Sequence, residues 1–492
     1  MEYETVIGLE VHAQLLTRSK MFCACSADYQ NAPPNTHVCP VCLGMPGVLP
    51  VINQLAVEYT VMTGLALHSE INLHSKFDRK NYPYPDLVKG YQISQFDLPL
   101  CKGGWLAIEV DGGIKRAQLN RIHLEEDTAK LTHKSNGFEP YSLIDINRSS
   151  VPLMEIVGEP DLRSAEEARQ YLIALRRIVR YLGVSTGNME EGSFRCDANV
   201  SLRPKGDTEY GNKVEVKNMN SFRSVFRALE FEVERQTKLL DQGVRIVQET
   251  RGWVDDQGIT VAQRSKEQAH DYRYFPEPDL PPLELSPEWV EAIRARLPEL
   301  PEAKRDRFIQ EYDLSKYDAE VLTASRAMSE FFETAVKQPV AAGSPGGAEA
   351  TSQRAKTVGN WCIGELPRLL NASNLEIEEA KITPQGLSEL IDLLETGNIS
   401  QTTAKRVFEE MFTTGQSAKS IVEVKGLVQI SGADELTRIV EKVIAANPQA
   451  IQDFRAGKQQ AVGFLVGQVM RETKGRANPE MATALLREKL AS

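Results

Sequence analysis

The sequence lacks the features that would place it at once in one of several large classes. No apolar run is long enough to cross a bilayer, which argues against a helical membrane protein. No G-x-x-x-x-G-K-S/T loop is present, so phosphate binding of the P-loop kind is excluded. The formal net charge of -11 argues against a protein that coats nucleic acid indiscriminately, although it is compatible with a local basic patch.

The pattern of a strand begins directly after Met1, so we expect neither a signal peptide nor a transit peptide. We therefore expect a cytoplasmic protein of a bacterium, or the processed form of an organellar one. The length of 492 residues exceeds what one hydrophobic core supports and predicts about three domains. A hydrophobic content of 41%, with 25% charged residues, supplies enough core material for them.

Strand patterns and hairpin turns dominate the first part of the chain. Asp111-Gly112-Gly113 separates two such strands and is a hairpin signal. Ser164 begins a capping box, and apolar residues at helical spacing follow it until Gly183; a second long helix is expected after Ser221. The mixture predicts an α+β fold, in which residues 1–285 form a cradle domain with an antiparallel sheet and segregated helices.

The strand pattern ends at a cluster of five prolines between residues 276 and 287, which we interpret as an extended linker. The chain beyond it has helical periodicity. We predict an all-helical middle domain over residues 286–400 and a helical tail domain over residues 401–492. Residues 451–492 contain seven basic and four acidic side chains, opposite to the balance of the whole chain, so a contact with nucleic acid is expected there.

Four of the seven cysteines form two close pairs, one C-x-C and one C-x-x-C. These are Cys23, Cys25, Cys39 and Cys42. Two turns can fold back to deliver four thiolates to one tetrahedral zinc ion, and such a closed site is structural because it leaves no open position for chemistry. A disulfide and four isolated thiols are the alternatives, and a reducing compartment disfavours the disulfide. The other three, Cys101, Cys196 and Cys362, have no partner spacing and are expected in the core.

Four short segments place apolar residues at every second position and polar, mostly ionisable ones in between, which is the pattern of half-buried strands. The polar positions are Glu10, His12 and Gln14; Arg121, His123 and Glu125; Asp197, Asn199 and Ser201; and Lys213, Glu215 and Lys217. If these strands share one sheet, its polar face gathers carboxylate, imidazole, guanidinium and ammonium groups. That face is either a solvated surface or a site for a metal ion and phosphates, and the residues alone leave both interpretations open.

One segment carries a family signature. The sequence DINRSSVPLMEIVGEP, from Asp145 to Pro160, resembles that of the B subunits of aspartyl/glutamyl-tRNA amidotransferases, although the family usually has Ser or Thr where this chain has Gly158. Further matching stretches are IGLEVH from Ile7, KNYPYPDL from Lys80, LEED from Leu124, RCDAN from Arg195, VEVKN from Val214 and DYRYFPEPD from Asp271. The resemblance spans the whole chain, with less specific motifs in its C-terminal third.

The resemblance implies a place in a heterotrimer with an A subunit, which releases ammonia from glutamine, and a C subunit. The B subunit uses ATP to phosphorylate the side-chain carboxylate of Glu-tRNA(Gln) or Asp-tRNA(Asn), and ammonia then displaces phosphate to give Gln-tRNA(Gln) or Asn-tRNA(Asn). No Gly-Gly-Ser-Ser amidase signature is present, so the glutaminase must be another chain. One rival function is a zinc-stabilised tRNA-binding scaffold without chemistry. Another is the archaeal relative restricted to Glu-tRNA, which the compact length disfavours.

The alternating strands fit such an activation step. Bringing a carboxylate to a triphosphate requires Mg²⁺ and cationic side chains to offset like charge, and Mg²⁺ prefers oxygen ligands. We predict as magnesium ligands Glu10, Glu125 and Glu215, with His12 and Asp197 next. The candidates for holding phosphates are Lys80, Arg148, Arg195 and Lys217, and a surface ion pair is the alternative for Lys80 and Arg148. The predicted catalytic set is Glu10, His12, Glu125, Glu215 and Lys80.

Overall fold

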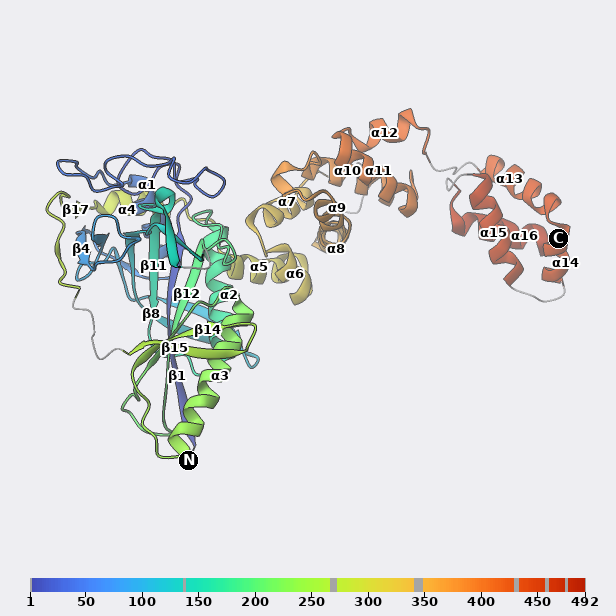
Figure 1. Cartoon of the computed structure of the whole chain (residues 1–492). Coiled ribbons are helices and arrows are strands. Elements are labelled where there is room, and N and C mark those ends of the chain that lie inside the picture. The colour runs from blue at the N-terminus through green and yellow to red at the C-terminus, as the bar shows by residue number, and fades with distance from the viewer. Residues whose placement is uncertain are drawn as a thin grey trace. The chain divides into compact units, whose positions relative to one another are not determined.

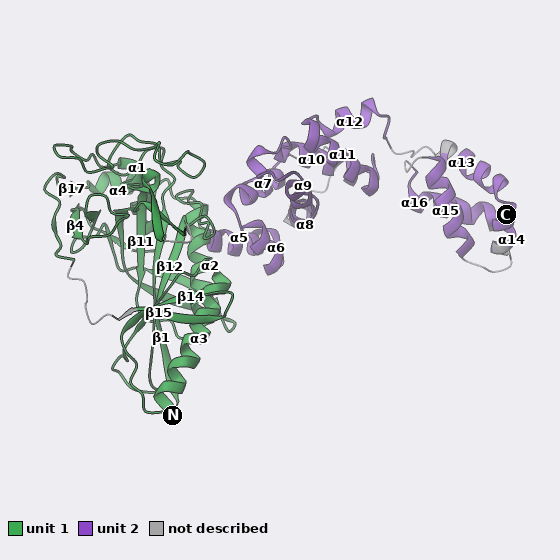
Figure 2. Ribbon diagram, viewed as in Figure 1, with its two compact units in different colours: residues 1–300 green, residues 301–492 purple. Residues whose placement is uncertain are grey.

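The computed structural model describes residues 2–135, 139–265, 272–339, 348–428, 433–455, 460–473 and 477–491. It confirms the α+β class, since a sheet-rich first part is followed by a helical part (Figure 1). The chain forms two compact units, residues 1–300 and residues 301–492 (Figure 2). None of the helices in the described ranges is long and apolar enough to cross a membrane.

The first unit is built on a ten-stranded sheet in the order β15-β14-β13-β12-β1-β11-β8-β6-β2, with β7 paired to β8. Its strands are β1 (Tyr3–Gln14), β2 (Glu70–Ile71), β6 (Cys101–Lys102), β7 (Trp105–Val110), β8 (Gly113–Glu126), β11 (Pro152–Gly158), β12 (Phe194–Pro204), β13 (Val214–Lys217), β14 (Glu249–Val254) and β15 (Ile259–Ser265). The long strand β1 lies at the centre and pairs antiparallel with both β11 and β12. Only the β13–β14 pair among these described strands is parallel, because helix α3 (Phe222–Asp241) forms the crossover between them.

Helices cover one face of this sheet. Helix α2 (Ala165–Tyr181) begins at Ser164, whose side chain accepts a hydrogen bond from the backbone N–H of Glu167, and α3 begins at Ser221 in the same way, as predicted. Apolar side chains of α2, α3 and α1 (Gln54–Ala66) share one core with the odd-numbered residues of β1. The pleat of β1 therefore turns its even-numbered, polar residues to the opposite face.

The proline-rich segment is not the extended linker that the sequence predicted. It forms β16 (Phe275–Pro276), which pairs with β4 (Asp78–Asn81), and β17 (Leu283–Glu284), which pairs with β3 (His74–Ser75). Helix α4 (Pro287–Arg294) then packs Val290 and Ile293 into the core of the first unit. Prolines are tolerated here because these are edge strands. The remaining elements of this unit are β5 (Tyr91–Ser94), which pairs with β4, the hairpin of β9 (Lys130–Ser135) and β10 (Pro140–Asp145), and the short helix η1 (Ile146–Arg148).

The second unit is helical in its described residues and holds two separate apolar clusters. The first cluster draws on α5 (Pro301–Tyr312), α6 (Lys316–Leu322), α7 (Arg326–Val336), α8 (Ala348–Ile363), α9 (Glu365–Ser373), η2 (Ile377–Glu379), α10 (Pro384–Glu395), α11 (Gln401–Thr414) and α12 (Ala418–Val424). The second draws on α13 (Ala433–Ala446), α14 (Pro448–Arg455), α15 (Gln460–Glu472) and α16 (Pro479–Ala491). Of the basic residues in the tail, Lys458, Lys474 and Arg476 lie outside the described residues.

Candidate active site and metal centre

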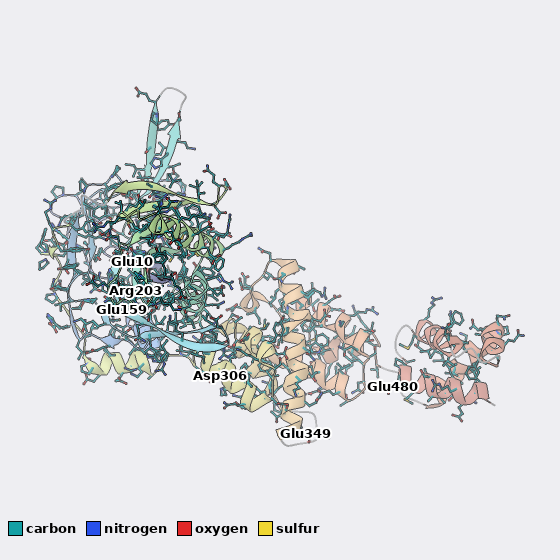
Figure 3. The ribbon with its side chains drawn as sticks, turned by 90° about the horizontal axis from the view of Figure 1, so that it is seen from below. Glu10, Glu159, Arg203, Asp306, Glu349 and Glu480 are labelled. Carbon is teal, nitrogen blue, oxygen red and sulfur yellow. The ribbon has the colours of Figure 1, made fainter. Side chains whose placement is uncertain are left out.

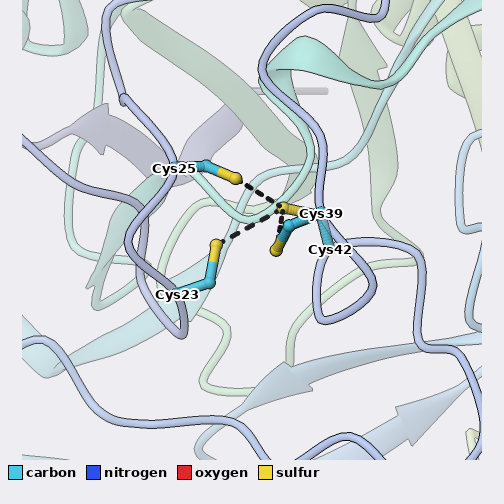
Figure 4. A group of neighbouring side chains, drawn as sticks. All are labelled: Cys23, Cys25, Cys39 and Cys42. Carbon is cyan, nitrogen blue, oxygen red and sulfur yellow. Dashed lines mark hydrogen bonds between the residues drawn. The ribbon is translucent and has the colours of Figure 1, made fainter.

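The four paired cysteines gather into one cluster (Figure 4). The Sγ atom of Cys42 lies 3.4 Å from that of Cys23, 3.7 Å from that of Cys39 and 3.8 Å from that of Cys25. A tetrahedron with Zn–S bonds of about 2.3 Å has S···S edges of about 3.8 Å. The spacing and the donor set therefore fit a closed zinc site, and all four side chains are free thiols rather than disulfides.

The surroundings of Cys42 favour the thiolate form of its side chain. The hydrogen bond from Cys23, with help from the nearby Lys20 ammonium, lowers the pKa of Cys42 to about 4. Burial raises the pKa of Cys25 to about 11, so its proton would leave only when a metal replaces it. The buried Lys20 Nζ lies 3.6 Å from Cys42 Sγ and donates to the carbonyl of His37 at 2.8 Å. The Lys20 ammonium therefore lies beside sulfur atoms that carry negative charge when they bind a metal ion.

We expect one zinc atom per chain by elemental analysis of protein purified without chelators. The Cys39→Ser variant should lose this zinc and melt at a lower temperature, because metal binding contributes to the folding free energy. Cys362→Ser, which alters a buried thiol of the second unit, is the matched control and should keep one zinc. Wild-type protein without zinc would contradict the assignment.

The sheet register brings the predicted polar residues together on the open face. On β1, His12 pairs with Glu155 of β11 on one side and with Arg195 of β12 on the other. Glu155 pairs in turn with His123 of β8, so that four ionisable residues from four strands form one row across the sheet. Glu10 lies two residues before His12 on β1 and pairs with Asp197 of β12 in the neighbouring row.

Three of these side chains, together with Glu125 of β8, form what we call the acid–histidine cluster: His12, His123, Glu125 and Glu155. His12 Nε2 lies 3.6 Å from Glu125 Oε1 and 3.5 Å from Glu155 Oε2. His123 Nε2 lies 3.1 Å from Glu155 Oε2 and 3.8 Å from Glu125 Oε2. Ser94 of β5 donates to Glu125 at 3.1 Å. Each carboxylate is therefore placed between two imidazoles.

Burial and charge act against each other in this cluster. Burial would lower the pKa of His123, but the charges of Glu155 and Glu125 outweigh it and raise that pKa to about 9. Burial also opposes the ionised form of Glu155, yet the two imidazoles hold its pKa well below its ordinary value. Lys80 of β4 behaves alike: although desolvation disfavours its ammonium, Glu125 is the main charge that raises the pKa of Lys80. The cluster is thus a buried set of compensating charges.

The raised pKa of His123 gives a test of this charge set. Its protonation stabilises the fold fully below the ordinary value of 6.5 and ceases to do so as pH rises through about 9. Removing the negative charge with Glu155→Gln should move the pKa of His123 down, as measured by NMR titration of labelled histidine side chains in magnesium-free buffer without a chelator. An unaltered His123 pKa in the variant would contradict this account.

The predicted magnesium set is not brought together as proposed. Among the described residues, Glu125 groups with His12 and Glu155, while neither Glu10 nor Glu215 belongs to that group. Glu10 instead accepts a hydrogen bond from Asn199 at 2.9 Å, and Glu215 accepts one from the Thr250 hydroxyl at 2.7 Å. The reason is geometric, because Glu10 sits one row further along β1 than His12, and Glu215 lies two strands away from β1.

Glu155 was missed as a candidate by the sequence reasoning. It stands alone in the strand Pro152–Gly158, whose other residues are apolar, proline or glycine, so no alternation marked it. A single carboxylate inside an apolar strand is itself the signal that could have found it, because a buried charge requires partners. The ligand atoms of His12, Glu125 and Glu155 lie within 4.8 Å of one another. Two carboxylates and one imidazole suit a divalent cation, which would displace the proton of His12.

Three of the four predicted phosphate-binding residues lie beside carboxylates, and Arg148 also donates to the backbone carbonyls of Thr128 and Ala129 at 2.8 and 2.9 Å. Arg195 Nη2 lies 2.8 Å from Asp127 Oδ2, and Arg148 Nε lies 3.6 Å from Asp127 Oδ1. Gln14 also donates to this buried aspartate, at 2.7 Å. Lys217 forms an ion pair with Asp197 and lies 3.2 Å from Glu215 Oε1. The cations are therefore fixed in orientation on the polar face rather than extended into solvent.

Comparison with known proteins gives matches along most of the chain. The model of the GatB/GatE catalytic domain matches residues 5–291, and that of the GatB domain matches residues 348–490. A relative from Dehalococcoides mccartyi, named as the B subunit of aspartyl/glutamyl-tRNA(Asn/Gln) amidotransferase, is 59% identical over 493 aligned residues, which cover 99% of each chain. Proteins of the same name from Thermomicrobium roseum and Carboxydothermus hydrogenoformans are 56% and 55% identical; each alignment covers 100% of this chain and 99% of the relative.

Proposed function

Because the chain belongs to the family of B subunits of aspartyl/glutamyl-tRNA(Asn/Gln) amidotransferases, we propose that it activates and amidates the side-chain carboxylate of a misacylated tRNA. The substrate is Glu-tRNA(Gln) or Asp-tRNA(Asn), and the products are Gln-tRNA(Gln) or Asn-tRNA(Asn) for protein synthesis. The ammonia comes from a glutaminase A subunit, and a C subunit completes the heterotrimer. The cysteine cluster carries a structural zinc ion beside this chemistry.

The reaction has two steps. An oxygen of the side-chain carboxylate attacks the γ-phosphorus of ATP, and ADP leaves. Ammonia then attacks the carbonyl carbon of the acyl phosphate, and inorganic phosphate leaves together with a proton. The first step is needed because a carboxylate has no good leaving group, and it brings two anions together, so it requires cations at the reacting atoms.

The acid–histidine cluster is the observation that supports this function. His12, Glu125 and Glu155 supply a donor set for Mg²⁺, which when bound offsets the charge of the phosphates. The Lys80 ammonium approaches from β4, and its charge is sustained by Glu125. Beside them, Arg195, Arg148 and Lys217 are held ready to contact phosphates. The polar face thus combines cations and metal ligands as a phosphoryl transfer requires.

The rival function, a tRNA-binding scaffold without chemistry, is less compatible with this site. Buried carboxylates such as Glu125 and Glu155 repel the phosphates of a nucleic acid unless a cation lies between them. A scaffold also has no need for three buried or half-buried cationic groups beside those carboxylates, namely His12, His123 and Lys80. The energetic cost of burying such charges is more readily explained by catalysis.

The Glu125→Gln variant tests the catalytic function. It keeps the shape of the side chain but removes the charge that faces both histidines and Lys80, so ATP-dependent amide formation should fall by about a hundredfold or more. Binding of the misacylated tRNA should persist. Amidation by the heterotrimer and tRNA affinity by filter binding measure the two effects separately.

Glu109→Gln is the matched control, because Glu109 is an exposed carboxylate of the neighbouring strand β7. It should leave both quantities unchanged. If Glu125→Gln amidates tRNA at the wild-type rate, the catalytic assignment of this cluster is wrong. If it loses tRNA binding in parallel with amidation, the scaffold function is favoured instead.

We further propose that the helical tail contacts tRNA, because positive charge is concentrated in residues 451–492. Helices α13 to α16 have their own apolar cluster, so removal of residues 433–492 takes away a whole packing unit. This deletion should raise the dissociation constant for tRNA by about tenfold or more at moderate salt and leave tRNA-independent ATP hydrolysis nearly unchanged. Equal tRNA affinity with and without the tail would refute the proposal.

A further inference from the structure

Arg148, one of the residues held ready to contact phosphates, belongs to a turn that follows a projecting hairpin. Strands β9 and β10 form a two-stranded sheet, which projects from the rest of the first unit in pale blue-green in Figure 3. Strand β10 ends at Asp145, and η1 follows directly. We call residues 144–148 the signature turn. An isolated hairpin is only marginally stable in water, so β9 and β10 do not by themselves fix this turn.

The loop of residues 33–37, which leads into Cys39 of the cysteine cluster, supports the signature turn. The side chain of Asn35 donates from Nδ2 to the carbonyl of Ile144 at 3.1 Å and accepts at Oδ1 from the N–H of Ile146 at 2.8 Å. The backbone N–H of Asn35 donates to Asp145 Oδ1 at 3.0 Å. Its amide therefore pairs with the turn as the backbone of a neighbouring strand would.

Asn147 makes the reciprocal contact from the turn to the loop. This fully buried residue accepts at Oδ1 from the N–H of His37 and donates from Nδ2 to the carbonyl of Pro33, both at 2.8 Å. Lys20 Nζ, which lies 3.6 Å from Cys42 Sγ, donates to the carbonyl of His37 at 2.8 Å. Hydrogen bonds thus lead from the sulfur atoms to the turn without a break.

The signature turn in turn determines where the Arg148 side chain begins. The guanidinium donates to the carbonyls of Thr128 and Ala129 and lies 3.6 Å from Asp127 Oδ1. Asp127 also holds Arg195 of the polar face, at 2.8 Å. These contacts require the turn to lie at the correct distance from residues 127–129. A displacement of about 1 Å at a group that contacts the reacting atoms can reduce a rate by about a hundredfold.

We propose that Asn35 and Asn147 are positioning residues, which fix the signature turn to the zinc-binding loop and thereby place Arg148 for its contact with phosphate. The inference rests on the proposed function, because it needs a phosphate for Arg148 to contact. Neither asparagine touches the substrate. The cysteine cluster, although it takes no part in the chemistry, then acts on the reaction through the position of this turn.

The first test is Asn35→Gly in the intact heterotrimer. Asn35 has a left-handed φ of 60°, which glycine adopts without strain, so the substitution removes only the side-chain hydrogen bonds. The kcat/KM for ATP in tRNA amidation should fall by about tenfold. Zinc should pass to a coloured chelator about three times faster or more, because its loop loses a partner. Asn147→Ala should show both effects.

Asn374→Gly is the matched control. Asn374 has a left-handed φ of 51° and ends helix α9 in the second unit, so the same substitution is made in the same backbone conformation. It should change neither kcat/KM nor the rate of zinc release. Zinc release at the wild-type rate from both Asn35→Gly and Asn147→Ala would overturn the inferred connection between the cluster and the turn.

A double-mutant cycle with Arg148→Ala separates positioning from general stability. If Asn35 acts through Arg148, the double variant should have the same kcat/KM as Arg148→Ala alone. Losses that multiply in the double variant would overturn the inference and leave the proposed function intact, as would wild-type amidation by Asn35→Gly or by Arg148→Ala. A wild-type heterotrimer that neither consumes ATP nor amidates tRNA would instead refute the proposed function itself.

Discussion

The pairing of one central strand with two antiparallel neighbours is the constraint on which the polar face depends. Strand β1 is held between β11 and β12 in a fixed register, and a shift by one residue would turn every side chain of β1 to the other face. The buried residues Leu9, Val11 and Ala13 prevent such a shift, because they belong to the same apolar core as residues of helices α2 and α3. The helix-covered core therefore determines where His12 and Glu10 lie, and the chemistry of the open face follows from packing on the closed one.

The second requirement is charge compensation. Burial opposes the ionised forms of Glu125 and Glu155, and the imidazoles of His12 and His123, with the ammonium of Lys80 beside Glu125, act against it and lower the pKa of both carboxyl groups. These five groups come from β1, β4, β8 and β11, so the cluster exists only in the folded sheet. The edge strand β16 pairs with β4, which carries Lys80. The proline-rich segment thus supports the site although it lies far from it in sequence.

Local pattern was sufficient for much of this structure. Period-two alternation placed His12, Glu125 and Asp197 on one sheet face, the serine caps at Ser164 and Ser221 marked two helices, and the cysteine spacing anticipated the thiol cluster. What the local pattern did not indicate depends on pairing between distant segments. The registers of β8, β11 and β1 bring Glu155 rather than Glu10 or Glu215 to Glu125. Likewise, the prolines alone indicated a linker. The strands β3 and β4, with which this segment pairs, are remote in the chain, so the local sequence did not reveal the pairing.

The central claim is that this face transfers a phosphoryl group to the side-chain carboxylate before ammonia arrives. The most direct measurement uses misacylated tRNA whose side-chain carboxylate carries ¹⁸O, with the heterotrimer, ATP and glutamine. If an acyl phosphate forms, one labelled oxygen moves from the carboxylate to inorganic phosphate for each amide made, and mass spectrometry of the phosphate detects it. Inorganic phosphate without the label, accompanying normal amide formation, would contradict the account.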